Sequence, residues 1–85
     1  MAHSSQPINV KCASAVLLAR VPAGVEIKPA AVGLANDFNW KVRLSVAENI
    51  ENMKMDKVDL IGELVQDEER DVVVRAAGAM ASMIV

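Results

Sequence analysis

The stretch from Asp37 to Met53 reads Asp-Phe-Asn-Trp-Lys-Val-Arg-Leu-Ser-Val-Ala-Glu-Asn-Ile-Glu-Asn-Met and joins a turn to a helix. Asp37 and Asn39 have short side chains whose oxygens can accept hydrogen bonds from the free N–H groups at a helix start. Apolar residues then recur with a helical period and predict one buried face: Val42, Val46, Ala47, Ile50 and Met53. Polar residues form the face expected toward solvent: Lys41, Ser45, Glu48, Asn49, Glu51 and Asn52. We predict a helix over 39–54.

The same design returns 30 residues later, where Asp67 stands at the position of Asp37. The apolar positions of the second helix continue the match: Val72, Ala76, Ala77, Met80 and Met83. Residues upstream of the two turns match in pairs: Ala30 with Leu60, Ala31 with Ile61, Leu34 with Leu64 and Ala35 with Val65. Self-similarity over two helices and a turn is typical of a helical repeat array, so we predict an all-α fold, a short α-α superhelix of about two and a half repeats.

The repeat register also sets the expected domain organisation. Residues 1–6 are expected to be a disordered tail and 7–85 the helical repeat segment. That segment divides, in chain order, into a lone helix at 7–21, one repeat at 27–54 and a second repeat at 56–85. Val21-Pro22-Ala23-Gly24 ends the lone helix, because proline lacks an N–H and glycine tolerates positive φ. The other helices are expected at 29–36, 57–66 and 71–84.

An apolar helix, an Asp-containing turn, Val-Arg and then an alanine-rich helix resemble the HEAT repeat. Within that superfamily, the run Asn-Asp-Phe-Asn-Trp-Lys-Val-Arg-Leu-Ser-Val-Ala-Glu-Asn-Ile is most similar to repeats of the scaffold (A, regulatory) subunit of serine/threonine phosphatase 2A. The resemblance covers residues 27–84. One feature departs from it: Arg43 and Arg75 are 32 apart, whereas the apolar positions align at 30. Either the second turn carries an insertion, or Arg75 does not occupy the position of Arg43.

The resemblance implies a non-enzymatic protein–protein interaction scaffold, possessing protein partners such as phosphatase catalytic or regulatory subunits, in the cytoplasm or also in the nucleus. In such scaffolds the turns between paired helices form a ridge that meets partner subunits. By matching position, the partner-binding ridge here would be Asp37, Phe38, Asn39, Trp40, Glu68, Glu69 and Arg70. The resemblance further implies that Asp37 and Arg43 hydrogen bond from turn to turn along the stack. Trp40 fits either an interface anchor or a ring that covers the seam between repeats beside Phe38.

The sequence offers no pattern for catalysis, a cofactor or a metal. The only cysteine is Cys12 and the only histidine is His3, and neither phosphate-binding glycine loops nor Cys/His metal spacings occur. Residues 1–43 hold five Lys/Arg and two acids, and 44–85 hold four and nine. No basic stripe with aromatics appears, which argues against nucleic-acid binding. The apolar runs at 12–19 and 76–85 are far shorter than the ~20 residues of a membrane span. The acid-free start faintly resembles a transit peptide.

Two other functions stay open: a small self-associating helical protein unrelated to HEAT solenoids, and a HEAT-like accessory module of an enzyme. The ends of the chain favour association. Val16, Leu17 and Leu18 make the first helix apolar nearly all round, and the last helix carries a stripe that the preceding helix can cover only in part: Ala76, Ala77, Met80, Met83 and Ile84. A solenoid buries such surfaces under another repeat or a polar cap. The methionines fit a core or an adaptable groove: Met53, Met55, Met80 and Met83.

Overall fold

Five α-helices and one short 3-10 helix make up the regular structure of residues 7–84, which the computed structural model describes, with side chains for 7–83. In chain order they are α1 (Ile8–Leu18), α2 (Lys28–Ala35), α3 (Trp40–Asn49), η1 (Ile50–Asn52), α4 (Val58–Leu64) and α5 (Arg70–Ile84). No strand occurs within 7–84. The predicted all-α class is confirmed. The expected tail at 1–6 lies outside the described residues.

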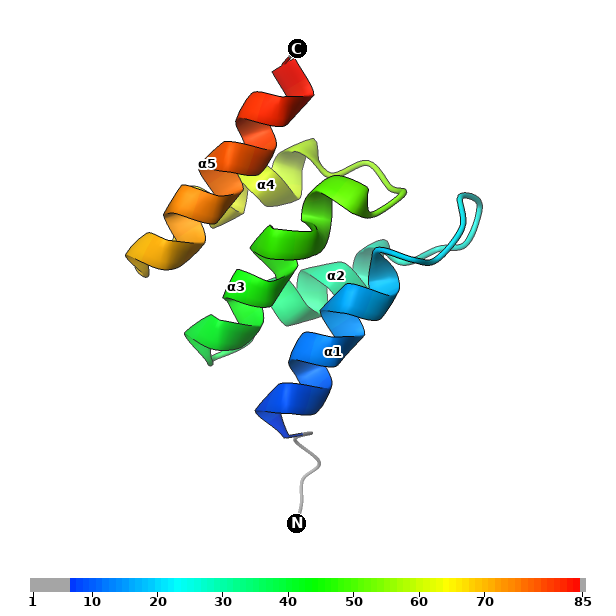
Figure 1. Ribbon diagram of the computed structural model, residues 1–85, viewed down its shortest axis with the longest axis horizontal. Helices are drawn as coiled ribbons and strands as arrows, with labels where there is room; N and C mark the ends of the chain where they lie inside the picture. Colours follow the sequence, from blue (N-terminus) through cyan, green and yellow to red (C-terminus); the bar gives the residue numbers. More distant parts are fainter. Residues whose placement is uncertain (1–6, 85) are drawn as a thin grey trace.

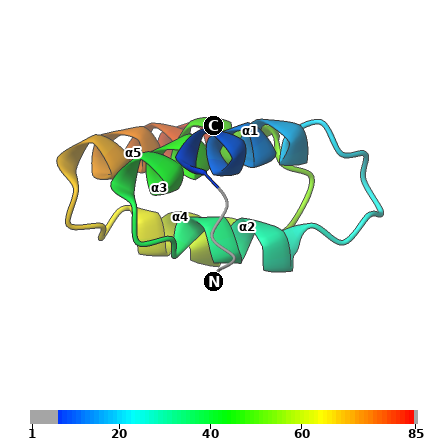
Figure 2. The same cartoon turned by 90° about the horizontal axis from the view of Figure 1, so that it is seen from below.

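The helices lie in two layers. Figure 2 shows α1, α3 and α5 in one layer and α2 and α4 in the other. Figure 1 shows that α1, α3 and α5 run in the same direction, with α1 and α5 at opposite edges of the row. The middle helix α3 contacts α1, α2 and α5, and α4 packs on α5. Each of α2–α3 and α4–α5 is therefore a helical hairpin, and α1 covers the free side of the first hairpin.

The start of α3 follows from its turn. Asn39 is the N-cap, and its Oδ1 accepts from the Lys41 N–H at 2.8 Å. The Asp37 Oδ2 accepts in turn from the Asn39 N–H at 2.9 Å. Both bonds satisfy N–H groups that have no partner within the helix. The capping role predicted for these two residues is thus present.

The end of α3 differs from the expected one. The helix stops at Asn49 and tightens into η1 instead of running to residue 54. Carbonyl groups at this end, which have no partner within the helix, are bonded by Lys57. Its Nζ donates to the carbonyl oxygens of Ile50, Glu51 and Met53 at 3.0, 2.8 and 2.7 Å. A lysine ammonium at a helix C-terminus meets both the unpaired carbonyls and the negative end of the macrodipole.

The apolar face predicted for residues 39–54, which α3, η1 and Met53 now make up, is buried. Its five members are at most 3% exposed: Val42, Val46, Ala47, Ile50 and Met53. Four of them, Val46, Ala47, Ile50 and Met53, form one core cluster with buried residues from the other α-helices: Ala15, Ala31, Ala35, Leu60, Ile61, Leu64, Val72, Ala76 and Ala79. The core contains small and aliphatic side chains, which lets the helices of the two layers approach closely.

Three side chains lie differently from the predicted faces. Ser45 was expected toward solvent but is 6% exposed, because α3 is covered on several sides; its Oγ donates to the Val42 carbonyl at 2.7 Å, so no donor is left unpaired. Asn49 is half-buried and its Nδ2 donates to the Ser45 carbonyl at 2.7 Å. In α5 the buried face holds Ala79, whereas Ala77 is exposed. A stripe drawn from apolarity alone cannot separate alanines on neighbouring faces.

Backbone hydrogen bonds fix the register between the hairpins. The Arg43 N–H donates to the Asn39 carbonyl, and the Val73 N–H donates to the Glu69 carbonyl in the same position of the next helix start. The hairpins are therefore related by 30 residues with no insertion in the second turn, and Val73 occupies the position of Arg43. By the same pattern Lys11, whose N–H donates to the Pro7 carbonyl, corresponds to Arg43.

Candidate functional site

The two hairpin turns share one carboxylate geometry. The Asp67 Oδ1 accepts from the Glu69 N–H at 2.9 Å, as the Asp37 Oδ2 accepts from the Asn39 N–H. The free oxygen of each carboxylate meets a cation from an earlier helix. Lys11 Nζ of α1 lies 2.7 Å from the Asp37 Oδ1. The aspartate in each turn therefore stabilises its own turn and also bonds a basic side chain from the preceding helix of the same layer.

Arg43 ties the two turns together. Its Nε and Nη2 donate to Asp67 Oδ2 and Oδ1 at 2.7 and 3.2 Å. Its Nη1 donates backward to the carbonyls of Asp37 and Phe38 at 2.9 and 3.0 Å. The Arg43 and Asp67 side chains are only 13% and 9% exposed. Charge-assisted bonds of this kind contribute about 1.5–3 kcal/mol each. The resemblance implied a turn-to-turn role for Arg43, and this geometry matches that role. The Asp37 carboxylate instead accepts a hydrogen bond from Lys11 of α1.

These contacts shift the acid–base equilibria of the turns. The hydrogen bond from Lys11 lowers the pKa of Asp37, with the Asn39 N–H acting in the same direction. Burial by itself would raise the pKa of Asp67, but the hydrogen bonds from Arg43 and from the Glu69 N–H outweigh it, and the pKa is lowered. The bond to Asp67 raises the pKa of Arg43. Both carboxylates are therefore held as anions near neutral pH.

Phe38 is the most exposed large side chain of the site. Its ring is 101% exposed, although its backbone carbonyl accepts from Arg43. Phe38 therefore does not cover the seam between repeats. Trp40 itself is half-buried at the first position of α3, with the Lys41 Nζ 5.9 Å from its ring centroid. The turn thus presents one fully exposed aromatic ring next to a partly covered one.

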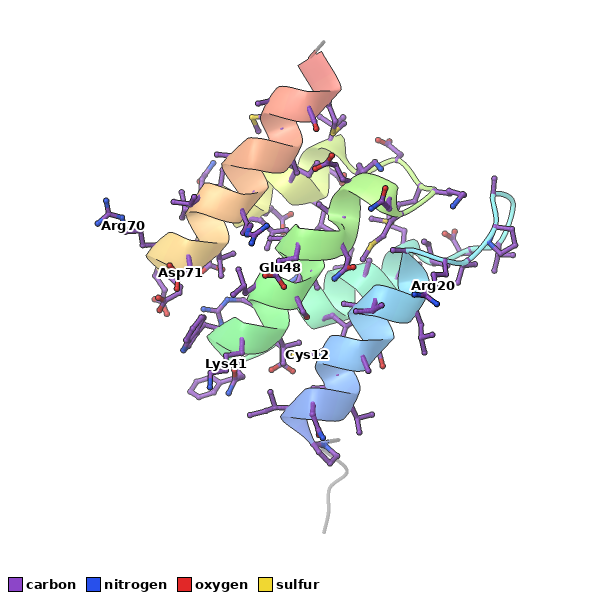
Figure 3. The ribbon with its side chains drawn as sticks, viewed as in Figure 1. Cys12, Arg20, Lys41, Glu48, Arg70 and Asp71 are labelled. Atoms are coloured by element: carbon purple, nitrogen blue, oxygen red, sulfur yellow. The ribbon has the colours of Figure 1, made fainter. Side chains whose placement is uncertain are left out.

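The seven predicted ridge residues lie in the two hairpin turns or, for Trp40 and Arg70, at the first position of the following helix, and the two turns lie on the same side of the molecule (Figure 2). Between the turns is an open cleft of about 520 Å³. Of the predicted residues, Asp37, Phe38 and Glu68 line it. The other four lie outside it: Asn39, Trp40, Glu69 and Arg70. Figure 3 shows Arg70 at the start of α5, pointing away from the helices.

The cleft is acidic. Its lining includes the carboxylates of Asp37, Glu63, Asp67 and Glu68, with Arg43 as a cation that is already bonded to Asp67. Glu63 and Glu68 are exposed and stand at its rim. Glu63 was not among the predicted residues, because it lies in α4 and only the folded hairpin brings it beside the turn. The surface suits a partner that offers cationic or hydrogen-bond-donor groups next to an apolar contact for Phe38.

No group of three or more His, Cys, Asp or Glu side chains within residues 7–84 is placed to hold a metal ion. Cys12 lies between α1 and α3, where its Sγ is 3.6 Å from the Lys41 carbonyl oxygen (Figure 3). His3 falls outside the described part of the chain. None of the helices seen in the structure has both the length and the apolar character required to cross a bilayer.

Protein-family models, curated protein sequences and solved structures each give no match to this chain.

Proposed function

We propose that the protein is a non-enzymatic protein-interaction scaffold of HEAT-like hairpins that binds a partner through its turn edge. The turn edge is defined here as Phe38, Trp40, Glu68, Glu69 and Arg70, on the framework of Asp37, Asn39, Arg43 and Asp67. Support for the HEAT-like relationship comes from the sequence resemblance over 27–84, the two hairpins in one 30-residue register, and the Arg43 bond between their turns.

The binding proposal rests on one observation: Phe38 is fully exposed, although the turn that carries it is fixed by hydrogen bonds. A free phenylalanine ring in water is unfavourable by the usual measure of apolar burial, ~25 cal/mol per Å². Three side chains fix this turn: Lys11 bonds the Asp37 carboxylate, Arg43 bonds the Asp37 carbonyl, and Asn39 caps α3. A turn that is already ordered loses little conformational entropy on binding, and aromatic residues are enriched among interface hot spots.

The proposal also names a class of partner. The resemblance makes phosphatase 2A catalytic and regulatory subunits the first partners to test, in the cytoplasm or nucleus. The acidic cleft beside Phe38 adds a condition: the partner surface should present lysine or arginine near an apolar pocket.

Affinity capture tests this proposal. The immobilised chain is exposed separately to purified phosphatase 2A catalytic and regulatory subunits, and the Phe38→Ala variant is compared with Val25→Ala. Val25 is a matched control, because it is 51% exposed and lies far along the chain in the α1–α2 connection. We expect Phe38→Ala to weaken capture by roughly tenfold or more and Val25→Ala to leave it unchanged, with equal helical circular dichroism. Equal capture by the two variants would contradict the turn-edge proposal, and no capture of either subunit would contradict the phosphatase proposal.

A further inference from the structure

Hydrogen bonds connect the backbone of the first hairpin turn to the backbone of the second through two side chains. The Phe38 carbonyl accepts from the Arg43 Nη1 at 3.0 Å. The other nitrogens of the same guanidinium donate to both carboxylate oxygens of Asp67. The Asp67 Oδ1 also accepts from the Glu69 N–H at 2.9 Å. The peptide groups of Phe38 and Glu69, which belong to different turns, are therefore linked by an unbroken chain of hydrogen bonds.

The link is mostly shielded from water, because little of the Arg43 and Asp67 side chains is exposed. Ion pairs on an open surface contribute little, since water screens them and both side chains remain free to move. Here the guanidinium donates through three nitrogens, and few other orientations of its planar fork would keep all of these bonds. The spacing between the turns is therefore set by the geometry of Arg43 and not by charge attraction alone.

Arg43 is alone in this role among the described side chains. Lys11 bonds Asp37 at 2.7 Å, but it joins a helix to a turn and not a turn to a turn. The pair of Lys28 and Asp59 joins α2 to α4 near the first residues of the two helices, at the ends away from the hairpin turns. Loss of the Arg43 bonds would thus leave the two turns without a direct polar connection.

The spacing of the turns matters because the exposed groups of the turn edge are divided between them. Phe38 stands on the first turn and Glu68 on the second, and both line the open cleft between the turns. Both side chains are exposed. A partner that contacts the two groups together would lose conformational entropy in ordering turns that move independently. That loss is avoided when the spacing is fixed before binding.

We propose that Arg43 is a positioning residue, which fixes the spacing of Phe38 and Glu68 so that one partner surface contacts both turns together. The inference rests on the proposed function of the turn edge. It adds that the contacts on the two turns are coupled, and that the coupling passes through a residue whose own side chain is largely covered.

Affinity capture of purified phosphatase 2A subunits by the Arg43→Lys variant tests the effect on binding. Lysine keeps the positive charge but cannot bond the Phe38 carbonyl and the Asp67 carboxylate through one planar fork. Val46→Ala is the control for stability, because it weakens the core face of the same helix and removes none of these bonds. Circular dichroism first establishes that both variants are folded. We expect Arg43→Lys to weaken capture by roughly five- to tenfold and Val46→Ala to leave it unchanged.

A double-mutant cycle tests the coupling itself. Phe38→Ala and Glu68→Gln are made singly and together, with Arg43 present and in the Arg43→Lys background. With Arg43 present, the double variant should lose less capture than the product of the two single losses, because each contact assists the other. In the Arg43→Lys background the two losses should multiply. Losses that multiply in both backgrounds would overturn the proposal.

Nuclear magnetic resonance relaxation of backbone amides tests the positioning role without any partner. We expect Arg43→Lys to introduce microsecond-to-millisecond exchange at Phe38 and Glu69 together, and Val46→Ala to leave both amides unchanged. Should Arg43→Lys fail to fold, Asp67→Asn breaks the same link from its other end. Unchanged relaxation at the two turns, or equal exchange in Val46→Ala, would overturn the positioning role. If relaxation changes as expected but neither subunit is captured, the proposed function fails and the coupled binding fails with it, whereas the positioning of the turns by Arg43 stands.

Discussion

Arg43 is the residue on which the geometry of the site depends most. Its guanidinium reaches Asp67 in the second turn and two backbone carbonyls in the first. A lysine could not replace it, because a single ammonium cannot present the planar fork that bonds a carboxylate in two places. The position is not repeated: Lys11 precedes it in register and Val73 follows it. The charged ladder along the turns therefore ends at Asp67.

Acid should destabilise the fold through the turn carboxylates. The pKa values of Asp37 and Asp67 are lowered in the folded chain, so the unfolded chain binds protons more readily. Their contribution to stability is present above the unfolded pKa of about 3.9 and is lost as the pH falls through the lower folded values. We expect the free energy of unfolding to fall between about pH 5 and pH 2, as measured by urea denaturation. Asp67→Asn should be less stable at neutral pH and show a shallower acid decline, with Asp56→Asn as the exposed control.

The exposure of Phe38 and the burial of Ser45 could not be predicted from the sequence. An apolar residue in a turn can cover a neighbour or stand free, and only the folded backbone shows that Phe38 stands free. Ser45 is polar and lies opposite the apolar stripe, yet α3 occupies the middle of a row and is covered there. Both cases depend on elements that are far away in the sequence. The cap at Asn39 was predictable because its partners lie within two residues.

At the scale of the element, the helices follow from local periodicity and their ends from particular side chains. All five expected helices are present, and each begins within one residue of the expected start. The predicted buried face of α3 is correct at every position, because a helical period maps directly onto one face. The boundary at Asn49 was missed because it depends on Lys57, which reaches back from the next connection.

Lys57 should act as a side-chain cap for the end of α3. Lys57→Met keeps most of the apolar stem but removes three hydrogen bonds to carbonyl oxygens. We expect a loss of about 1–3 kcal/mol in the free energy of unfolding. The Met53 N–H, which donates to the Ile50 carbonyl, should also exchange faster with deuterium. Lys54→Met, at an exposed neighbouring position, is the control, and equal effects of the two variants would show that Lys57 does not cap the helix.

The face assignment of the helices can be tested with two valines. Val46 is fully buried in α3, and Val74 is 61% exposed in α5. Val46→Ala removes buried methyl groups and should cost about 1–3 kcal/mol of unfolding free energy. Val74→Ala should stay within about 0.5 kcal/mol, because most of its side chain is exposed to water. The comparison should be made at a concentration at which the wild type is monomeric. Similar losses in the two variants would mean that the faces are wrongly assigned.

At the scale of the whole molecule, the protein has two kinds of surface. The turn edge is polar and holds one fully exposed aromatic ring, whereas the helices at the two ends of the row expose apolar side chains: Val10 and Leu17 in α1, and Met80 and Met83 in α5. The sequence predicted both kinds: the ridge by matching position and the uncovered ends by their apolarity. It could not show the cleft between the turns, since Glu63, Asp37 and Glu68 meet there only after the hairpins pack.

The central claim, that the turn edge is the partner-binding surface, is tested most directly by nuclear magnetic resonance mapping. The labelled chain is titrated with phosphatase 2A catalytic or regulatory subunit, and backbone amide signals are followed. We predict that signals of Phe38, Trp40 and Glu68 shift or broaden first, while those of Leu17 in α1 and Val74 in α5 remain unchanged. Changes confined to Leu17 and Val74, with the turns unaffected, or a spectrum that does not change with either subunit, would contradict the account.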